Sequence, residues 1–306
     1  MKLGFLISVQ KDARHLRDLV ASLPVGADYY IHVDRHRDLQ HFERIVKGEN
    51  IHFLTQRVRV IPGSLNEVEV QVALIRAALE GDADYLVSID GLDYPLWSNA
   101  RIEEFFSDAK DRQFISGIAM PGQGRAAYKY TDFQLLNDHI WQHGSFKNSV
   151  RSLARRVLTG GHVFKTLRIH CPEKTYTLYK GSTSWAITRE VGQLILQEWD
   201  ENKHLKVYFS TSYRPVETFI PTVVFNSQYA SQGLLVKGKL SDANTLMPLT
   251  YVGHTHSPKV LTETDLAAVR DSRKMFARQI VSDYSDGLKS MIDAERVKNE
   301  ELGVKS

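Results

Sequence analysis

The sequence has almost no cysteine and no long apolar run. Among its 306 residues only Cys171 is a cysteine, so no disulfide can form within the chain, and a reducing compartment fits best. No segment approaches the roughly 18–20 apolar residues that a membrane-spanning helix needs. The apolar stretch at the N-terminus covers only about seven residues and is followed by charge, so we interpret it as a buried strand and not as a signal peptide.

The sequence also lacks a dominant charge and several familiar motifs. Lys and Arg number 39 and Asp and Glu number 36, for a formal net charge of +3. This balance weighs against nucleic acid as a partner, because nucleic-acid-binding proteins are usually more basic. Neither G-x-G-x-x-G after the first strand nor G-x-x-x-x-G-K-[ST] anywhere is present. H-E-x-x-H and C-x-x-C do not occur either, so no pattern indicates a zinc site.

Strand and helix patterns alternate through the first 90 residues. Apolar runs predict strands over 2–9, 28–34 and 85–89, and helical periodicity predicts helices over 13–23, 38–47 and 64–80. Ser64 and Glu67 have the spacing of a capping box at the start of the third helix. This β-α-β order predicts an α/β fold with a mostly parallel sheet that helices cover on both faces.

Polar residues follow the predicted strands. Ser8 and Val9 end the first strand, Asp34 ends the second and Asp90 ends the third. Ligands of such sheets bind outside the carboxyl ends of the strands, so these residues predict a nucleotide crevice. The alternative is that Asp34 and Asp90 only cap turns. Asp93 follows Asp90 in "SIDGLD", and two carboxylates there could also hold a divalent cation under a phosphate.

The second half holds further charged candidates. Glu217 lies in a first helical turn after Pro215, where it could reach a substrate or simply complement the helix dipole. Thr262 and Asp265 have a capping spacing, and the helix predicted after them places three cations at i, i+4 and i+8. These are Arg270, Lys274 and Arg278. On one helix face they would repel each other unless an anion lay nearby.

Two further features each have two interpretations. Trp185, beside 181–184, could stack on a sugar ring or could be a core aromatic on a strand. The basic segment 147–168, with Lys147, Arg151, Arg155, Arg156, Lys165 and Arg168, could be a solvated helix and connector. It could instead bind an anionic acceptor or membrane head groups as a peripheral contact.

Six motifs occur in an order that resembles the core-2/I-branching glycosyltransferases, relatives of the peptide xylosyltransferases. They are "YIHVDRHRD", "VIPGSLNEVEVQVALIRAAL", "DYLVSIDGLDYPLWS", "GSTSWAITRE", "RPVETFIPTVVFNS" and "HTHSPKVLTETDL…FARQI". The chain is most similar to the soluble bacterial branch, since the animal relatives are Golgi-anchored and disulfide-bonded. The resemblance implies a GT-A-like α/β/α sandwich with a Rossmann-like half and C-terminal helices. We expect one domain over 1–285, divided into a nucleotide-binding half (1–116) and an acceptor-binding and catalytic half (117–285), and a helical tail over 286–306.

The resemblance also implies an activity. Such enzymes invert configuration as they move a sugar from a UDP-sugar to a hydroxyl of a glycan acceptor, without a divalent metal. We therefore expect a UDP-sugar of the GlcNAc or xylose class as donor, a glycan as acceptor, and no cofactor. Bacterial surface polysaccharide assembly in the cytoplasm, with peripheral association at the inner face of the membrane, is the expected setting.

Site residues follow from the same resemblance, position by position. The family's general base falls on Glu217, its uridine-contacting aspartate on Asp34 near Ser8 and Val9, and its C-terminal phosphate-binding basic residue on Arg278. A second family arginine falls at or beside His256, where Lys259 or Arg270 could substitute. The residues expected around the donor sugar and acceptor are Asp90, Asp93, Ser182, Trp185, Arg125 and Lys129.

Three other interpretations stay open. A metal-dependent GT-A transferase would use Asp90 and Asp93. A non-catalytic nucleotide-sugar or glycan-binding protein could use the same scaffold, because a fold does not fix a function. A glycosidase would need two carboxylates across one sugar, and the sequence shows no evident pair beyond Asp90 and Asp93.

Overall fold

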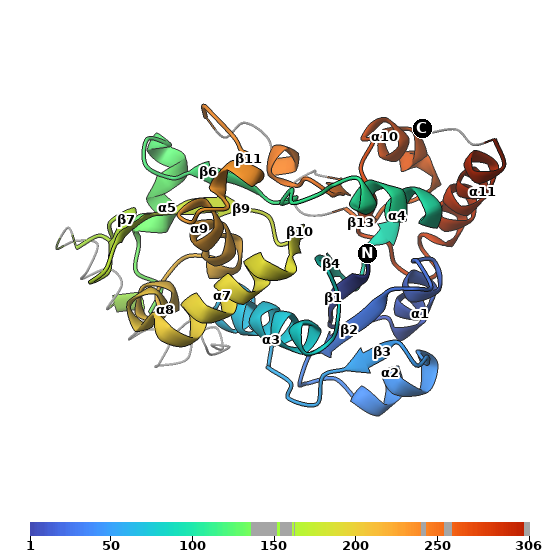
Figure 1. The fold of residues 1–306 in the computed structure, drawn as a ribbon, viewed down its shortest axis with the longest axis horizontal. Coiled ribbons are helices and arrows are strands. Elements are labelled where there is room, and N and C mark those ends of the chain that lie inside the picture. The colour runs from blue at the N-terminus through green and yellow to red at the C-terminus, as the bar shows by residue number, and fades with distance from the viewer. Residues whose placement is uncertain (136–151, 154–160, 162, 240–242, 254–258, 303–306) are drawn as a thin grey trace.

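The structure is a computed structural model that describes residues 1–135, 152–153, 161, 163–239, 243–253 and 259–302 (Figure 1). His256 and most of the basic segment 147–168 therefore lie outside the described residues. The elements of the first half are β1 (Leu3–Val9), α1 (Ala13–Ala21), β2 (Asp28–Val33), α2 (Leu39–Ile45), β3 (Ile51–Phe53), α3 (Asn66–Glu80), β4 (Tyr85–Asp90), β5 (Tyr94–Pro95) and α4 (Asn99–Ser107).

A five-stranded sheet in the order β10-β4-β1-β2-β3 forms the centre of the molecule. All pairs are parallel except the pair between β4 and β10 (Trp185–Thr188). In β1 every residue from Leu3 to Val9 is buried apart from the partly exposed Ser8, as expected for a strand covered on both faces. The register pairs Ser8 with Asp90 and with His32. The carboxyl ends of the predicted strands therefore lie at the same edge of the sheet. The predicted α/β fold is confirmed.

Helices cover both faces of this sheet. On one face α3 packs beside α7 (Arg189–Glu201), and their apolar stripes share a core with Leu6 and Leu86. On the other face α1, α2 and α4 contribute Leu16, Phe42 and Phe106 to a second core. Figure 1 shows α3 and α7 together on one side of the strands and α1 on the other. The start of α3 does not form the predicted capping box, because Glu67 Oε2 accepts a hydrogen bond from the Gly63 amide instead of the Ser64 amide.

The second half builds smaller sheets around the central one. The strands β11 (Leu234–Leu235), β6 (Ser116–Ala119) and β9 (Tyr179–Gly181) form one, and β7 (Arg168–His170) pairs with β8 (Thr175–Thr177). A third sheet joins β12 (Thr250–Val252), β13 (Phe276–Arg278) and β5. The helical elements here are η1 (Gly124–Ala127), α5 (Tyr128–Thr131), α8 (Lys203–Ser210), η2 (Pro215–Glu217), α9 (Phe219–Phe225), η3 (Ala230–Gln232) and η4 (Ala243–Leu246).

The C-terminal region corrects one prediction. The capping box between Thr262 and Asp265 is present at η5 (Glu263–Asp265), but the following α10 (Leu266–Asp271) ends before Lys274. Arg278 lies in β13, where Phe276 and Ala277 are fully buried. The three cations therefore do not share a helix face, because a run of consecutive buried apolar residues forms a strand there.

The last helix, α11 (Asp286–Leu302), packs onto the body of the protein. Leu288 and Ile292 are buried with Leu261 and Tyr94, and Lys289 forms an ion pair with Asp18 of α1. Figure 1 shows α4, α10 and α11 grouped at one end of the molecule. Within the described residues, no helix has both the length and the apolar character that crossing a bilayer requires.

Candidate functional site

A cavity of about 240 Å³ lies at the carboxyl ends of β1 and β4. The strands contribute Ser8 and Asp90, and β13 contributes Arg278. The remaining lining comes from further residues of β1 and β4, from α3, and from Gln10, Val60, Thr183 and Val216, the last of which precedes Glu217. The structure thus brings together three residues that were predicted from segments far apart in the sequence. It does so because β13 pairs with β5, which follows β4 after a tight turn.

Arg278 is fixed in this cavity by a buried carboxylate. Its Nε and Nη2 donate hydrogen bonds to Asp93 Oδ1 and Oδ2 at 2.5 and 2.7 Å, and Nη2 also donates to Ser184 Oγ at 2.8 Å. Burial disfavours the charged guanidinium, but the carboxylates of Asp93 and Asp90 outweigh that effect and raise the pKa of Arg278. The arginine therefore stays cationic, in a fixed orientation, at the cavity wall.

The turn from Asp90 to Asp93 explains why both aspartates are there. The Asp93 carboxylate also accepts a hydrogen bond from the Asp90 amide at 2.9 Å, and Asp90 Oδ1 accepts one from the Leu92 amide at 3.0 Å. Gly91 packs so closely on Val9 that a Cβ atom would lie 2.5 Å from Val9 Cγ2. Asp93 has no exposed surface, so in this structure its carboxylate holds the turn, and the predicted sugar contact stays a prediction. Asp90 does face the cavity.

A short loop between β9 and β10 braces the arginine. Ser182 Oγ accepts a hydrogen bond from the Ser184 amide, and the Thr183 carbonyl accepts one from Ser88 Oγ. Ser182 is itself buried. Its described contacts give it a role in holding this loop, while the neighbouring Thr183 lines the cavity.

Glu217 lies in η2 beside the cavity and is held by two cations. Its Oε1 accepts a hydrogen bond from Arg214 at 2.7 Å, and its Oε2 lies 3.3 Å from Lys180 Nζ. Arg214 has φ of 44°, a conformation that is costly for a residue other than glycine. This backbone turns the chain sharply just before Pro215, and it sets the carboxylate at the start of the helical segment as predicted.

Aromatic side chains surround this carboxylate. The rings of Tyr130 and Tyr213 meet edge to face at 5.6 Å, and Lys180 Nζ lies 6.0 Å from the Tyr130 ring. Lys129 Nζ lies 5.9 Å from the Tyr213 ring, which places this predicted acceptor contact near Glu217. Arg125 is exposed on η1, and no contact described here links it to that cluster.

Two cavity residues on α3 were not predicted as site residues. Glu67 and Gln71 line the cavity one helical turn apart, and burial raises the pKa of the Glu67 carboxyl. Electrostatic interactions with Arg214 and Glu217 also reach Glu67. The helical spacing of positions 67, 70, 71 and 74 could have indicated that they share one face of the helix. Glu67 was instead interpreted as part of a capping box.

Asp34 and Val9 support the cavity from the neighbouring strand ends. Asp34 Oδ1 accepts a hydrogen bond from the His36 amide at 2.9 Å, and the Asp34 amide donates to the Val9 carbonyl. Asp34 is 7% exposed and is not part of the cavity lining. This contact matches the turn-capping alternative, and the predicted uridine contact stays a prediction. Beside it, His32 Nε2 accepts a hydrogen bond from the Val58 amide at 2.9 Å.

Several other predicted site residues lie elsewhere. Trp185 is 1% exposed in β10, which matches the core alternative and leaves no ring face for a sugar. Lys259 forms an ion pair with Asp265 at 2.6 Å, and Arg270 forms one with Glu295 of α11. Neither side chain lines the cavity, and the expected substitution of Lys259 or Arg270 for the second phosphate contact stays a prediction. His256 lies outside the described residues.

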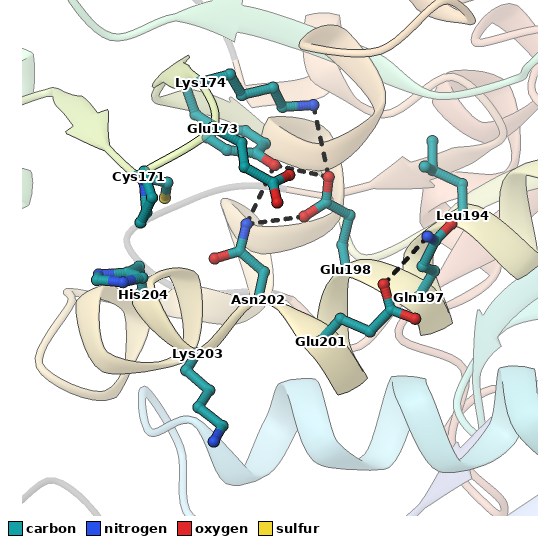
Figure 2. A pocket seen from close by; sticks show the side chains of 12 residues that line it. Cys171, Glu173, Lys174, Leu194, Gln197, Glu198, Glu201, Asn202, Lys203 and His204 are labelled. Carbon is teal, nitrogen blue, oxygen red and sulfur yellow. Dashed lines mark hydrogen bonds and ion pairs between the residues drawn. The ribbon is translucent and has the colours of Figure 1, made fainter.

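A second, larger cavity of about 550 Å³ lies against α7 and α8 (Figure 2). Its central carboxylate, Glu198, accepts hydrogen bonds from Tyr176 at 2.6 Å and from Asn202 at 3.0 Å. Lys174 Nζ lies 3.5 Å from the same carboxylate. Figure 2 shows the side chains of Lys174 and Asn202 pointing toward Glu198. None of the predicted site residues lines this cavity.

The chain is similar in sequence to known transferases. N-acetyllactosaminide beta-1,6-N-acetylglucosaminyl-transferase of Homo sapiens is 22% identical over 205 residues, which are 64% of this chain and 46% of that protein. Xylosyltransferase 2 of Homo sapiens is 22% identical over 208 residues, 65% of this chain and 21% of that protein. The chain therefore spans less than half the length of either relative.

A solved structure, CMP:2-keto-3-deoxy-manno-octonic acid synthetase complexed with CTP, aligns with 80% of this chain and 95% of its own. Its sequence identity is 12% and the TM-score is 0.34, a likeness too low to inform function. The family model described as Core-2/I-Branching enzyme matches residues 3–270, which is most of the chain and includes the cavity residues from β1, α3 and β4. This chain belongs to the Core-2/I-Branching enzyme family.

Proposed function

We propose that the protein is an inverting glycosyltransferase that moves a sugar from a UDP-sugar to a hydroxyl of a glycan acceptor. The observation that carries the proposal is the cavity that Arg278 shares with Asp90, directly beside the segment that bears Glu217. Family membership and the named transferase relatives support the same activity. The relatives' names favour an N-acetylglucosamine or xylose donor.

The reaction has two chemical requirements. The acceptor hydroxyl must lose a proton as it attacks the sugar, and a carboxylate beside it can take that proton. The departing diphosphate gains negative charge, which a fixed cation in a water-poor site stabilises. In this proposal Glu217 is the base and Arg278 contacts the diphosphate. Arg278 lines the cavity and Glu217 lies next to its Val216 wall, so a donor bound at Arg278 and an acceptor hydroxyl at Glu217 could meet there.

We further propose that transfer does not need a metal ion bound by Asp90 and Asp93. The Asp93 carboxylate is occupied by Arg278 and by the Asp90 amide, so it is already neutralised by a cation of the protein. A metal-dependent transferase remains the second candidate, and it would need Asp93 to release Arg278.

The setting of the reaction is also proposed from the resemblance alone. We infer that the acceptor belongs to a bacterial surface polysaccharide and that the enzyme works in the cytoplasm. Peripheral association at the membrane would involve the basic segment 147–168, which lies largely outside the described residues. The predicted division into halves at 116 stays a prediction.

A transfer assay with a Glu217→Gln variant tests the proposed base. The variant keeps the size of the side chain and removes the charge that accepts the proton, so the rate should fall by about 10²- to 10⁴-fold, while the affinity for a UDP-sugar changes little. Glu201→Gln, on α7 at the larger cavity, is the matched control and should keep the wild-type rate. Near wild-type transfer by Glu217→Gln would show that another group is the base.

A further inference from the structure

Gln71 presents an unpaired acceptor at the proposed donor cavity. The residue is 7% exposed, lies on α3 and lines the cavity. Its Nε2 donates a weak hydrogen bond of 3.4 Å to the Thr183 carbonyl. Its Oε1 is buried, and the described residues offer it no hydrogen-bond partner. A buried acceptor without a partner is uncommon in folded proteins, and it often marks a place where a ligand or water binds.

The surroundings of Gln71 indicate what kind of ligand group would bind there. Glu67 lies four residues earlier on the same face of α3 and lines the same cavity. A carboxylate beside Gln71 disfavours a phosphate at this wall, whereas Arg278 contributes a fixed cation elsewhere in the cavity lining. A neutral group with hydroxyl donors fits the α3 wall better than an anion does.

The order of groups along the cavity narrows this further. In a nucleotide sugar the diphosphate separates the nucleoside from the sugar. Val216, the neighbour of Glu217, lines the cavity, whereas Asp34, the residue expected near uridine, does not. The part of the donor inside the cavity, next to Gln71, is therefore the sugar and not the uracil ring.

We propose that Gln71 is a specificity-determining residue that accepts a hydrogen bond from a hydroxyl of the donor sugar through Oε1. Glu67 offers a second acceptor one turn away. Its Oε2 already accepts from the Gly63 amide at 2.7 Å, and no hydrogen bond to its Oε1 is found among the described residues. The α3 wall would then distinguish sugars by their hydroxyl pattern. This inference rests on the proposed function.

Calorimetric titration of wild type and a Gln71→Met variant with UDP and with UDP-sugars tests it. Methionine has a similar length and no comparable acceptor, so the affinity for the preferred UDP-sugar should fall by about 5- to 10-fold, the usual loss for one hydrogen bond. The affinity for UDP itself should not change. Arg76→Met, which removes a surface ion pair of α3 with Asp200, should change neither affinity.

Deoxy analogues of the preferred UDP-sugar give a second measurement. With wild type, removal of one particular hydroxyl should weaken binding by a similar factor, and with Gln71→Met the same removal should have no further effect. Equal losses in both proteins, or equal weakening of UDP and UDP-sugar by Gln71→Met, would overturn the inference. If wild type binds UDP but no UDP-sugar binds more tightly than UDP does, the sugar is not held by this wall and the inference also fails. If neither binds wild type, the proposed function itself fails.

Discussion

Two cavities of this protein differ in whether their polar groups already have hydrogen-bond partners. The larger one, of about 550 Å³, surrounds Glu198, whose carboxylate is already bonded to Tyr176 and Asn202. The smaller one, of about 240 Å³, has a fixed Arg278, an Asp90 that faces the space, and an acceptor on Gln71 without a partner among the described residues. Of these two cavities, volume alone would favour the larger one as a binding site.

Polar side chains without hydrogen-bond partners therefore indicate a binding site better than cavity volume does. Glu198 and its partners Tyr176 and Asn202 satisfy one another's hydrogen bonds, so they stabilise this part of the fold. The smaller cavity instead holds its cation in place through the buried Asp93 and keeps acceptors available. It also lies at the carboxyl ends of parallel strands, where ligands of such folds bind. Substitutions in each region can sharpen or break this contrast.

The largest effect is expected from Arg278→Ala. Removal of the guanidinium leaves Asp93 buried without a counter-charge, which should lower the free energy of unfolding by about 3–5 kcal/mol. Binding of UDP should be lost as well, because the proposed phosphate contact is gone. Chemical denaturation measures the first effect and calorimetric titration the second.

The double variant Asp93→Asn with Arg278→Met separates these two effects. It replaces the ion pair with uncharged groups, and the amide oxygen of the introduced asparagine can still accept the bond from the Asp90 amide. Such replacements are often close to neutral for stability. We expect stability to recover and UDP binding to stay absent. UDP binding at wild-type affinity in the double variant would contradict the role of Arg278.

A smaller effect on stability is expected when the pH is lowered, because His32 lies on β2 beside Ser8 of the smaller cavity. Burial disfavours the charged imidazolium and lowers the pKa of His32 from 6.5 to about 4. The neutral ring accepts a hydrogen bond from the Val58 amide. The unfolded chain therefore takes up this proton first, so stability is fully present above pH 6.5 and is lost as pH falls from 6.5 toward 4. By pH 4 the loss from this group should approach about 3 kcal/mol.

Comparison with His32→Gln isolates that contribution. The glutamine side chain has an oxygen that can accept from the Val58 amide, and it does not titrate. Unfolding free energies measured from pH 7 to pH 4 should fall less steeply in the variant than in wild type. Parallel curves would show that His32 is not the group responsible.

The smallest effect is expected at the larger cavity. Glu198→Gln turns one acceptor oxygen into a donor that faces Asn202 Nδ2 or the Tyr176 hydroxyl, so stability should fall by about 1 kcal/mol. Transfer activity should remain at the wild-type level. A loss of activity with little loss of stability would mean that the larger cavity is the functional one, and it would reverse the comparison.

The sequence predicted most of the central sheet. Long apolar runs such as 2–9 and the helical pattern of 64–80 identify their elements, because each is buried on a face that its periodicity describes. The helix predicted from 266 was wrong only beyond Asp271, because the helical spacing of three cations did not reveal the buried strand at Phe276–Arg278. The spacing of charged residues predicts only which side chains could share an exposed face. The local structure here follows instead from the burial of Phe276 and Ala277 in a strand.

The candidate site was predicted in part for the same kind of reason. Ser8, Asp90 and Arg278 meet as expected, since strand ends and motif order carry that information. The sequence could not show that Asp93 would lie under Arg278, because the pair joins residues 185 positions apart. Nor could it show Gln71, whose unpaired oxygen is visible only once the loop at 182–184 is in place.

Calorimetric titration of the wild-type protein with UDP-sugars, first in EDTA and then with Mn²⁺, tests the central claim most directly. We predict that one UDP-sugar binds with the same affinity in EDTA and with Mn²⁺, because Arg278 and not a metal ion contacts the diphosphate. Binding that appears only with Mn²⁺ would contradict the account and would assign Asp90 and Asp93 to a metal site.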